Sequence, residues 1–310
     1  MNGRKALAGV YNILTTPFLP DGALDQASLR RLTEAVIAAG VDGITVLGVA
    51  GEAQKLTGDE RGEVVRTVLD VAAGRFPVFA GTSQEGTDAT VAASRAAERA
   101  GAAGVMIAPP AFLQPGPALT EHLRRAGEAI SGPIVLQDYP PVNGVTMTPA
   151  AIAALVEAVP AITTIKLEGT PTPQRTAQTL DLVAGRATVL GGLGGMYLLD
   201  ELRRGASGTM TGFAYPEVLV EIWRAWRSGD RRAAAESYAR YLPLLVFEGQ
   251  PGVGLAVRKA ILRRRGLIDH AVVRHPGPAL DQRLADDLEE TLALLDVESR
   301  FDARSAWRLA

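Results

Sequence analysis

The chain repeats one pattern about eight times: a short, apolar, β-like run followed by a helical stretch. The β-like runs are Val10–Thr16, Gly43–Gly48, Pro77–Gly81, Gly104–Ala108, Pro133–Asp138, Ile162–Glu168, Thr188–Gly192 and Ser207–Gly212. Most of them are almost continuously apolar, which is typical of strands that are buried on both faces of a parallel sheet. Eight such units without a long linker predict an α/β fold, a (β/α)8 TIM barrel, rather than an open doubly wound sheet.

Residues that begin helices separate these runs. Asp25 precedes one helical stretch, and Thr57 with Glu60 forms a T-x-x-E capping box at the start of another. Thr148 and Thr172 each precede a proline, and this pairing predicts two further N-caps. These helix-capping signals therefore agree with strands that alternate with helices.

The last third of the chain looks entirely helical. We expect residues 1–216 to form the barrel, and residues 217–310 to form the last barrel helix, a helical C-terminal extension and a tail. The two parts are expected to make one structural unit, with the extension available for oligomer contacts. The tail, Glu298–Ala310, is expected to be loosely held.

Composition narrows the chemistry that the chain can perform. It has no cysteine and three scattered histidines, which excludes thiolate chemistry and argues against a metal site. A net charge of −2 with mixed signs argues against a nucleic-acid partner. No membrane span and no signal-peptide apolar region are recognisable, so a cytoplasmic protein is expected.

Catalytic groups of such barrels lie where strands end and βα loops begin. Applied to the runs above, this rule selects Thr15-Thr16-Pro17-Phe18, Gly48-Val49-Ala50-Gly51-Glu52, Gly81-Thr82-Ser83, Pro109-Pro110, Gln137-Asp138-Tyr139-Pro140, Lys166-Leu167-Glu168, Gly191-Gly192 and Gly212-Phe213. The candidate catalytic residues among them are Lys166, Glu168, Tyr139 and Gln137. The candidate substrate-binding residues are Thr15, Thr16, Gly48, Val49, Ala50, Gly51, Glu52 and Gly212.

Lys166 is the sharpest of these features. Side chains alternate faces along a strand, so Ile165 and Leu167 share one face while Thr164, Lys166 and Glu168 share the face that lines the barrel. Burial there favours the neutral amine that attacks a carbonyl. The chain has 28 Arg but four Lys, and Arg cannot supply that neutral form. A buried ion pair between Lys166 and Glu168 is the alternative interpretation.

Four motifs occur in a characteristic order. They are Thr15-Thr16-Pro17-Phe18, the G-x-x-G-E loop at 48–52, Pro109-Pro110 and the lysine of the sixth run. In this order and spacing the chain resembles the dihydrodipicolinate synthase/N-acetylneuraminate lyase family over about residues 9 to 297. The resemblance implies a barrel that forms a Schiff base between Lys166 and a 2-keto acid, without a bound cofactor, in a homotetramer or dimer.

The loop after the second run departs from the family pattern G-T/S-T-G-E, whose hydroxyls hold the substrate carboxylate and relay protons. Val49 and Ala50 stand at the two hydroxyl positions. The backbone N–H groups of Ala50 and Gly51 remain as a small anion nest. Replacement hydroxyls are available from Thr15, Thr16, Thr82 or Ser83, and a plain glycine-rich connection is the alternative.

The fifth run departs as well. Gln137 occupies the tyrosine position of the family's Y-N-x-P corner, and Tyr139 follows two residues later, as a proton relay or as ordinary packing. Val142 stands where the synthases carry an arginine, and Phe112 where they carry a tyrosine from a neighbouring subunit. Dihydrodipicolinate synthesis is therefore not expected.

Among the other branches of the family, the chain resembles the 2-keto-3-deoxy sugar acid dehydratases. The resemblance rests on Leu136–Pro140 and on the pair Lys166 and Glu168. A Lys166 iminium would acidify C3, and a base would remove the C3 proton before the C4 hydroxyl leaves. Glu168 is the candidate base or acid, with a purely structural role as the alternative, and Gln137 and Tyr139 would orient the leaving hydroxyl. Asp138 is expected to point away from the site.

Three other functions stay open. An aldolase would cleave the C3–C4 bond of a related 2-keto-3-deoxy acid through the same enamine. A barrel that binds a small acid or a partner without turnover is the second. A phosphate-binding barrel that uses the glycine-rich segment Gly191–Gly195 is the third.

Overall fold

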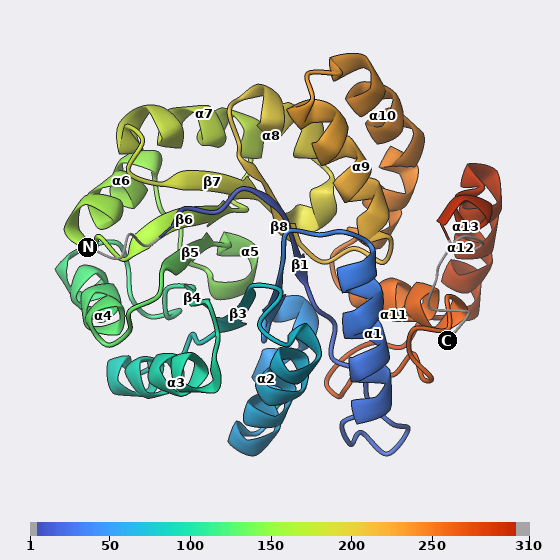
Figure 1. The fold of residues 1–310 in the computed structure, drawn as a ribbon, viewed down its shortest axis with the longest axis horizontal. Coiled ribbons are helices and arrows are strands. Elements are labelled where there is room, and N and C mark those ends of the chain that lie inside the picture. The colour runs from blue at the N-terminus through green and yellow to red at the C-terminus, as the bar shows by residue number, and fades with distance from the viewer. Residues whose placement is uncertain (1–4, 302–310) are drawn as a thin grey trace.

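Eight parallel strands form a closed barrel in the order of the chain, which confirms the predicted fold class (Figure 1). The computed structural model describes residues 5–301. The strands are β1 (Gly9–Ile13), β2 (Gly43–Val46), β3 (Val78–Gly81), β4 (Gly104–Ile107), β5 (Ile134–Asp138), β6 (Ile162–Leu167), β7 (Thr188–Gly191) and β8 (Gly208–Thr211). Pairing of β8 with β1 closes the barrel.

Helices surround the barrel, as Figure 1 shows. They are α1 (Gln26–Ala38), α2 (Gly58–Ala72), α3 (Thr87–Ala100), α4 (Pro117–Glu128), α5 (Pro140–Asn143), α6 (Pro149–Ala158), α7 (Thr172–Val183), α8 (Leu198–Arg203) and α9 (Pro216–Arg227). Short 3-10 turns lie in two of the βα loops: η1 (Val49–Gly51), η2 (Ala53–Lys55) and η3 (Leu193–Gly195).

Three of the four predicted N-caps are confirmed. The side chains of Asp25, Thr57 and Thr148 each accept a hydrogen bond from a backbone N–H in the first turn of their helix, and Glu60 completes the capping box. The prediction for Thr172 is wrong. Pro171 adopts the extended cap conformation instead, so Thr172 becomes the first helical residue and its side chain is fully buried.

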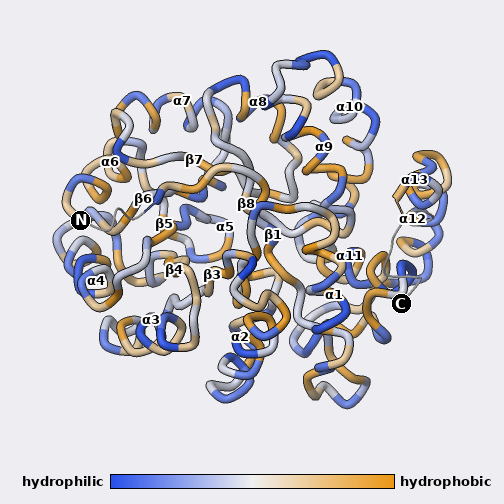
Figure 2. Tube along the Cα trace, viewed as in Figure 1, coloured by the Kyte–Doolittle hydropathy of each residue, from blue (hydrophilic) through white to orange (hydrophobic). Residues whose placement is uncertain are grey.

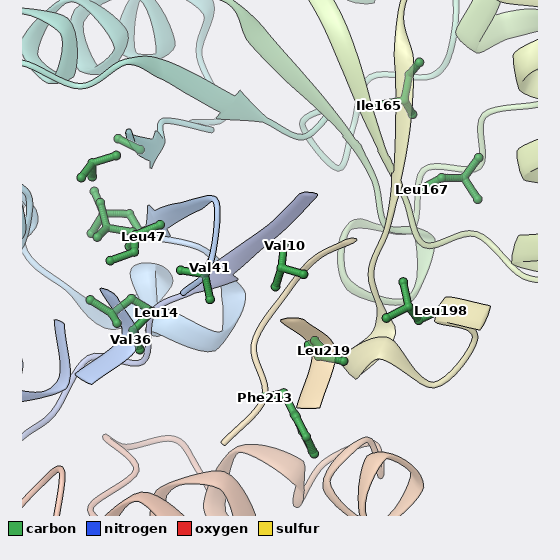
Figure 3. Close-up of a cluster of buried hydrophobic side chains, with 14 of the residues drawn as sticks. Val10, Leu14, Val36, Val41, Leu47, Ile165, Leu167, Leu198, Phe213 and Leu219 are labelled. Carbon is green, nitrogen blue, oxygen red and sulfur yellow. The ribbon is translucent and has the colours of Figure 1, made fainter. Parts of the chain in front are cut away.

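Apolar side chains pack in two concentric layers. The outer layer lies between strands and helices and includes Ile165 and Leu167, which confirms their predicted face (Figure 3). The inner layer fills the barrel below its mouth with Leu7, Tyr11, Ile13, Phe79, Met106, Val135, Leu190 and Met210. The tube in Figure 2 accordingly carries hydrophobic residues along the strands and hydrophilic ones on the outer turns of the helices.

The C-terminal extension consists of α10 (Arg231–Glu248), α11 (Gly254–Arg264), α12 (Gln282–Leu295) and α13 (Val297–Phe301). Helix α10 packs on α9, while α12 and α13 stand at the edge of the molecule (Figure 1). The first residues of the predicted tail, 298–301, belong to α13, where Glu298 and Arg300 form ion pairs with Arg264 and Glu221. Residues 302–310 lie outside the described part.

No helix between residues 5 and 301 is both long and apolar enough to cross a membrane.

Candidate active site

Lys166 lies on the inner face of β6, in register with Gln137 on β5 and Leu190 on β7. Its side chain is 6% exposed and sits above the inner apolar layer. A lysine in this position is largely shielded from water and interacts mainly with the groups beside it.

Glu168 is the main partner of Lys166. Its Oε2 atom lies 2.9 Å from Lys166 Nζ and accepts a hydrogen bond of 2.8 Å from the side-chain amide of Gln137. Its Oε1 atom accepts a 3.3 Å hydrogen bond from the Leu193 N–H. The buried ion pair that was the alternative interpretation is thus present.

Tyr139 also lies beside the lysine, with its ring centroid 5.9 Å from Lys166 Nζ. Strand β5 ends at Asp138, so Tyr139 reaches the site from the loop before α5. Burial and the nearby Glu168 carboxylate raise the pKa of its hydroxyl, which keeps the phenol protonated. Asp138 points the other way, as expected, and pairs with Arg175 at 2.8 Å outside the barrel.

The glycine-rich segment after β7 serves packing. A Cβ on Gly192 would lie 2.4 Å from Glu168 Cγ, so the glycine provides the space that the carboxylate side chain occupies. The N–H groups of Gly194 and Gly195 donate to Thr211 Oγ1 and to the Gly192 carbonyl. These donors are therefore already used, which speaks against a phosphate site in this segment.

The loop at 48–52 offers fewer donors than expected. The Gly51 N–H donates to the Gly48 carbonyl at 3.0 Å, so it is not available to an anion, and Ala50 keeps the other N–H of the predicted nest. The Thr16 hydroxyl donates to the Gly51 carbonyl at 2.7 Å and orders the loop rather than facing a substrate. Val49 lines a pocket at the barrel mouth.

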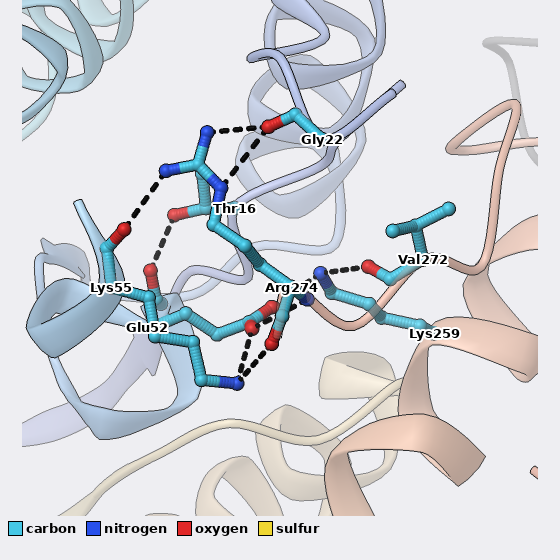
Figure 4. Close-up of polar contacts among 8 residues, drawn as sticks. Thr16, Gly22, Glu52, Lys55, Lys259, Val272 and Arg274 are labelled. Carbon is cyan, nitrogen blue, oxygen red and sulfur yellow. Dashed lines mark hydrogen bonds and ion pairs between the residues drawn. The ribbon is translucent and has the colours of Figure 1, made fainter. Parts of the chain in front are cut away.

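The carboxylate of Glu52, a candidate substrate-binding residue, turns toward the C-terminal extension (Figure 4). The residue is 2% exposed and adopts a left-handed conformation (φ 55°, ψ 33°) between η1 and η2. Its Oε2 lies 2.8 Å from Lys55 Nζ and accepts from the Arg274 N–H at 3.0 Å, while Oε1 contacts Lys259. Glu52 therefore ties the loop to α11 and its following segment.

The remaining predicted positions surround the mouth. Thr15 lines a narrow space between β1 and α11. A Cβ on Gly48 would lie 2.7 Å from Ile13 Cγ2, and a Cβ on Gly212 would lie 2.4 Å from Arg258 Nη1. The Thr82 hydroxyl shares a hydrogen bond with Ser94, while Ser83 accepts one from the Ala108 N–H and lines the pocket at the mouth.

A pocket of about 250 Å³ opens beside Gln137 and Tyr139. It is lined mainly by the loops after β2, β3, β4 and β5, and polar side chains on its wall include Gln54, Arg61, Gln84 and Asn143. This composition suits a small, hydroxyl-rich molecule. In the described part of the chain, no three or more His, Cys, Asp or Glu side chains are grouped so that they could hold a metal ion.

Arg258 on α11 is the residue near the mouth that sequence reasoning missed. Its guanidinium lies over Gly212, at the carboxyl end of β8. Nothing in the local sequence marks it, since it is one of many arginines in a helical extension. Gly212 lies on the inner face, two residues after Met210. A glycine at such a position indicates that a side chain from another part of the chain fills the space beside it.

Fold and site together define a class: (β/α)8 barrels that hold a buried lysine beside a carboxylate at the carboxyl ends of their strands. Within that class, the model of the Dihydrodipicolinate synthetase family matches residues 6–294, and the chain belongs to this family.

Two curated relatives are similar over most of their length. The chain is 34% identical to the L-2-keto-3-deoxyarabonate dehydratase of Azospirillum brasilense, over 88% of this chain and 89% of that protein. It is also 34% identical to the 4-hydroxy-tetrahydrodipicolinate synthase of Sorangium cellulosum, over 96% of this chain and 98% of the relative.

Solved structures agree with this assignment. The dihydrodipicolinate synthase of Rhodopseudomonas palustris superposes with a TM-score of 0.87 at 37% identity, covering 93% of this chain and 97% of that one. YagE of E. coli K12, a prophage protein of the same family solved with pyruvate, also has a TM-score of 0.87, at 27% identity, with 94% and 99% covered.

Proposed function

We propose that the protein is a lyase that forms a Schiff base between Lys166 and a 2-keto acid, and that it dehydrates a 2-keto-3-deoxy sugar acid. The observation that carries this proposal is the buried cluster in which Glu168 contacts both Lys166 and Gln137. It places a nucleophilic amine, a proton acceptor and an amide within one site, above an apolar floor.

The first step needs a neutral amine. Glu168, 2.9 Å away, accepts the proton of the Lys166 ammonium, and the free amine adds to the C2 carbonyl of the substrate. Glu168 then gives this proton to the carbinolamine oxygen, which leaves as water, so that an iminium joins Nζ to C2 and Glu168 is a carboxylate again. The positive nitrogen makes the C3 protons acidic, because their removal gives a neutral, conjugated enamine.

The second step removes the C4 hydroxyl. Glu168 is placed to take the C3 proton, and the enamine electrons then expel the C4 oxygen, which leaves as water after receiving a proton. The Tyr139 hydroxyl, protonated because its pKa is raised, is the donor that we assign to this oxygen. Water finally hydrolyses the conjugated iminium and releases the 2-keto product and the Lys166 amine.

Two departures favour this reaction over dihydrodipicolinate synthesis. Val142 and Phe112, which stand at the positions expected for an arginine and a tyrosine in the synthases, are apolar and exposed at 47% and 66%. Neither can hold a second substrate carboxylate. The similarity to a 2-keto-3-deoxyarabonate dehydratase points in the same direction.

Borohydride trapping tests the Schiff base. Incubation with pyruvate and sodium borohydride should add a reduced three-carbon adduct to the protein, and peptide mass spectrometry should locate it on Lys166. The Lys166→Ala variant serves as the control and should remain unmodified. An unmodified wild-type protein would contradict the proposal and would favour a barrel that binds acids without turnover.

Product analysis tests the reaction type. Incubation with 2-keto-3-deoxyarabonate should yield a 2-keto product with all five carbons and one water fewer. Pyruvate together with an aldehyde would instead identify an aldolase. Glu168→Gln should slow the formation of the trapped adduct and lose about 100-fold or more in turnover, because it keeps the shape of the side chain but cannot accept a proton.

Assembly and location belong to the same proposal. The protein is proposed to be a cytoplasmic homo-oligomer that needs no bound cofactor besides the covalent Schiff base. One similar solved structure is described as a monomeric dihydrodipicolinate synthase variant, so the oligomeric state varies among similar proteins. Sedimentation at several protein concentrations measures it for this chain.

A further inference from the structure

Two inward-facing glycines on neighbouring strands leave space for two charged side chains. Gly192 follows β7 and gives its space to Glu168, while Gly212 follows β8 and gives its space to Arg258. The Arg258 side chain is 11% exposed. A guanidinium from the C-terminal extension thus lies at the mouth of the barrel, one strand away from the carboxylate that contacts Lys166.

The Arg258 guanidinium is held by one of its nitrogens only. Its Nε lies 2.5 Å from Oε1 of Glu248, a carboxylate whose other oxygen accepts a 3.0 Å hydrogen bond from the Ala214 N–H. Among residues 5–301, the two terminal nitrogens of Arg258 make no hydrogen bond. Glu248 therefore orients the guanidinium and leaves free the two groups that bind a carboxylate in parallel.

Ile13 connects this guanidinium to the loop at 48–52. A Cβ on Gly212 would lie near both Arg258 and the Ile13 carbonyl oxygen, and a Cβ on Gly48 would meet Ile13 Cγ2. Arg258 and the Gly48 loop therefore flank the end of β1 from opposite sides. An anion that rests above Ile13 lies between the loop and the arginine.

The charge of Arg258 also reaches across the mouth. It acts on the Tyr139 hydroxyl, where it opposes the rise in pKa that burial and Glu168 cause. Since Tyr139 lies beside Lys166, the charge of Arg258 acts on the immediate surroundings of Lys166. A 2-keto acid bound at Lys166 brings its carboxylate into that environment.

The loop alone is poorly equipped for this carboxylate. Its two hydroxyls are replaced by Val49 and Ala50, the Gly51 N–H is used within the loop, and the Thr16 hydroxyl is used by the Gly51 carbonyl. A carboxylate that leaves water needs charged or strong donors in return.

We infer that Arg258 binds the C1 carboxylate of the 2-keto acid whose keto group reacts with Lys166. This inference rests on the proposed function and adds a specificity-determining residue to it. The Arg258 guanidinium binds the carboxylate in place of the hydroxyls that the loop at 48–52 lacks. The side chain that holds the acid thus enters the barrel from α11.

The test compares a charged and an uncharged ketone of the same size. Borohydride trapping is measured as a function of pyruvate and, separately, of pyruvamide, in wild type, Arg258→Gln, Arg258→Lys and the control Arg263→Gln on the same helix. Arg258→Gln should raise the half-saturating pyruvate concentration about 10- to 100-fold, the cost of losing hydrogen bonds to a charged group. The value for pyruvamide should not change, and Arg258→Lys should show a smaller loss than Arg258→Gln.

The outcomes separate this inference from the proposed function. Trapping in wild type but no effect of Arg258→Gln on pyruvate overturns the role of Arg258 and leaves the Schiff base in place. Equal losses for pyruvate and pyruvamide also overturn it, because they show general damage to the site. No trapping in wild type removes the proposed function, and this inference with it.

A second variant covers the case in which Arg258→Gln does not fold. Gly212→Ala places a methyl group 2.4 Å from the present position of Arg258 Nη1 and should displace the guanidinium. It should raise the half-saturating concentration of pyruvate more than that of pyruvamide. An equal response of the two ligands would overturn the inference.

Discussion

The side-chain amide of Gln137 donates to the Glu168 oxygen that contacts Lys166, so the glutamine holds the carboxylate from the next strand. Gln137→Leu keeps the size of the side chain and removes this donor. We expect turnover to fall about 10-fold, because hydrogen bonds to charged groups are worth about 1.5–3 kcal/mol. Gln178→Leu on the exposed face of α7 is the control, and equal turnover in Gln137→Leu and wild type would contradict the role.

Tyr139 is both a ring beside Lys166 and a hydroxyl with a raised pKa. Tyr139→Phe keeps the ring and removes the proton donor. We predict that turnover falls about 100-fold while trapping of pyruvate on Lys166 is unaffected, since general acid catalysis contributes about that much. Steady-state kinetics with the sugar acid, alongside trapping, measures both. Unchanged turnover would show that the ring serves packing alone.

Lys259 is fully buried against Glu52, and burial lowers the pKa of its ammonium to about 8. Lys259→Met removes one partner of a buried pair, and we expect it to lower the free energy of unfolding by about 3 kcal/mol. Urea unfolding measures the loss, with Arg263→Met as an exposed control on the same helix. Adding Glu52→Gln should recover part of it, and a loss no larger than that of the control would contradict the structural role.

Glu201 on α8 is fully buried behind β7, beside Gly191, and burial raises the pKa of its carboxyl from 4.5 to about 7. The folded chain thus keeps a proton that the unfolded chain releases, so this group lowers stability as pH rises from 4.5 to about 7. Glu201→Gln should stabilise the protein at pH 8 by on the order of 2 kcal/mol and lose this advantage near pH 5.

Urea unfolding at the two pH values checks the Glu201 prediction. Asp200→Asn, a change at the adjacent and more exposed residue of α8, should show no comparable dependence. The same gain for Glu201→Gln at both pH values would assign it to packing rather than to the proton.

The barrel could be predicted from the sequence because each buried strand carries its signal locally. All eight strands lie within the expected runs, apart from Gly9 at the start of β1. Alternation along β6 also placed Lys166 and Glu168 on the inner face of the barrel, and alternation along β5 placed Asp138 on the outer face. The structure confirms these three positions. These placements depend only on neighbouring residues.

The rest of the site depends on contacts between distant parts of the chain. Glu52 belongs to a loop that resembles a binding loop, yet its left-handed backbone turns the carboxylate toward Lys259. Arg258 reaches Gly212 from α11, and local sequence patterns do not show where this helix packs on the barrel. Thr172 matches a capping pattern, but the preceding proline takes the cap.

Arg258 and Lys259 are consecutive on α11, and successive residues of a helix point about 100° apart. One of them fills the space over Gly212 while the other neutralises Glu52 in the loop after β2. Insertion or deletion of a single residue ahead of this pair would rotate both away from their targets. The extension and the barrel therefore have to be inherited together, and a chimera that joins this barrel to a relative's last helices would work only if the spacing up to these two positions is preserved.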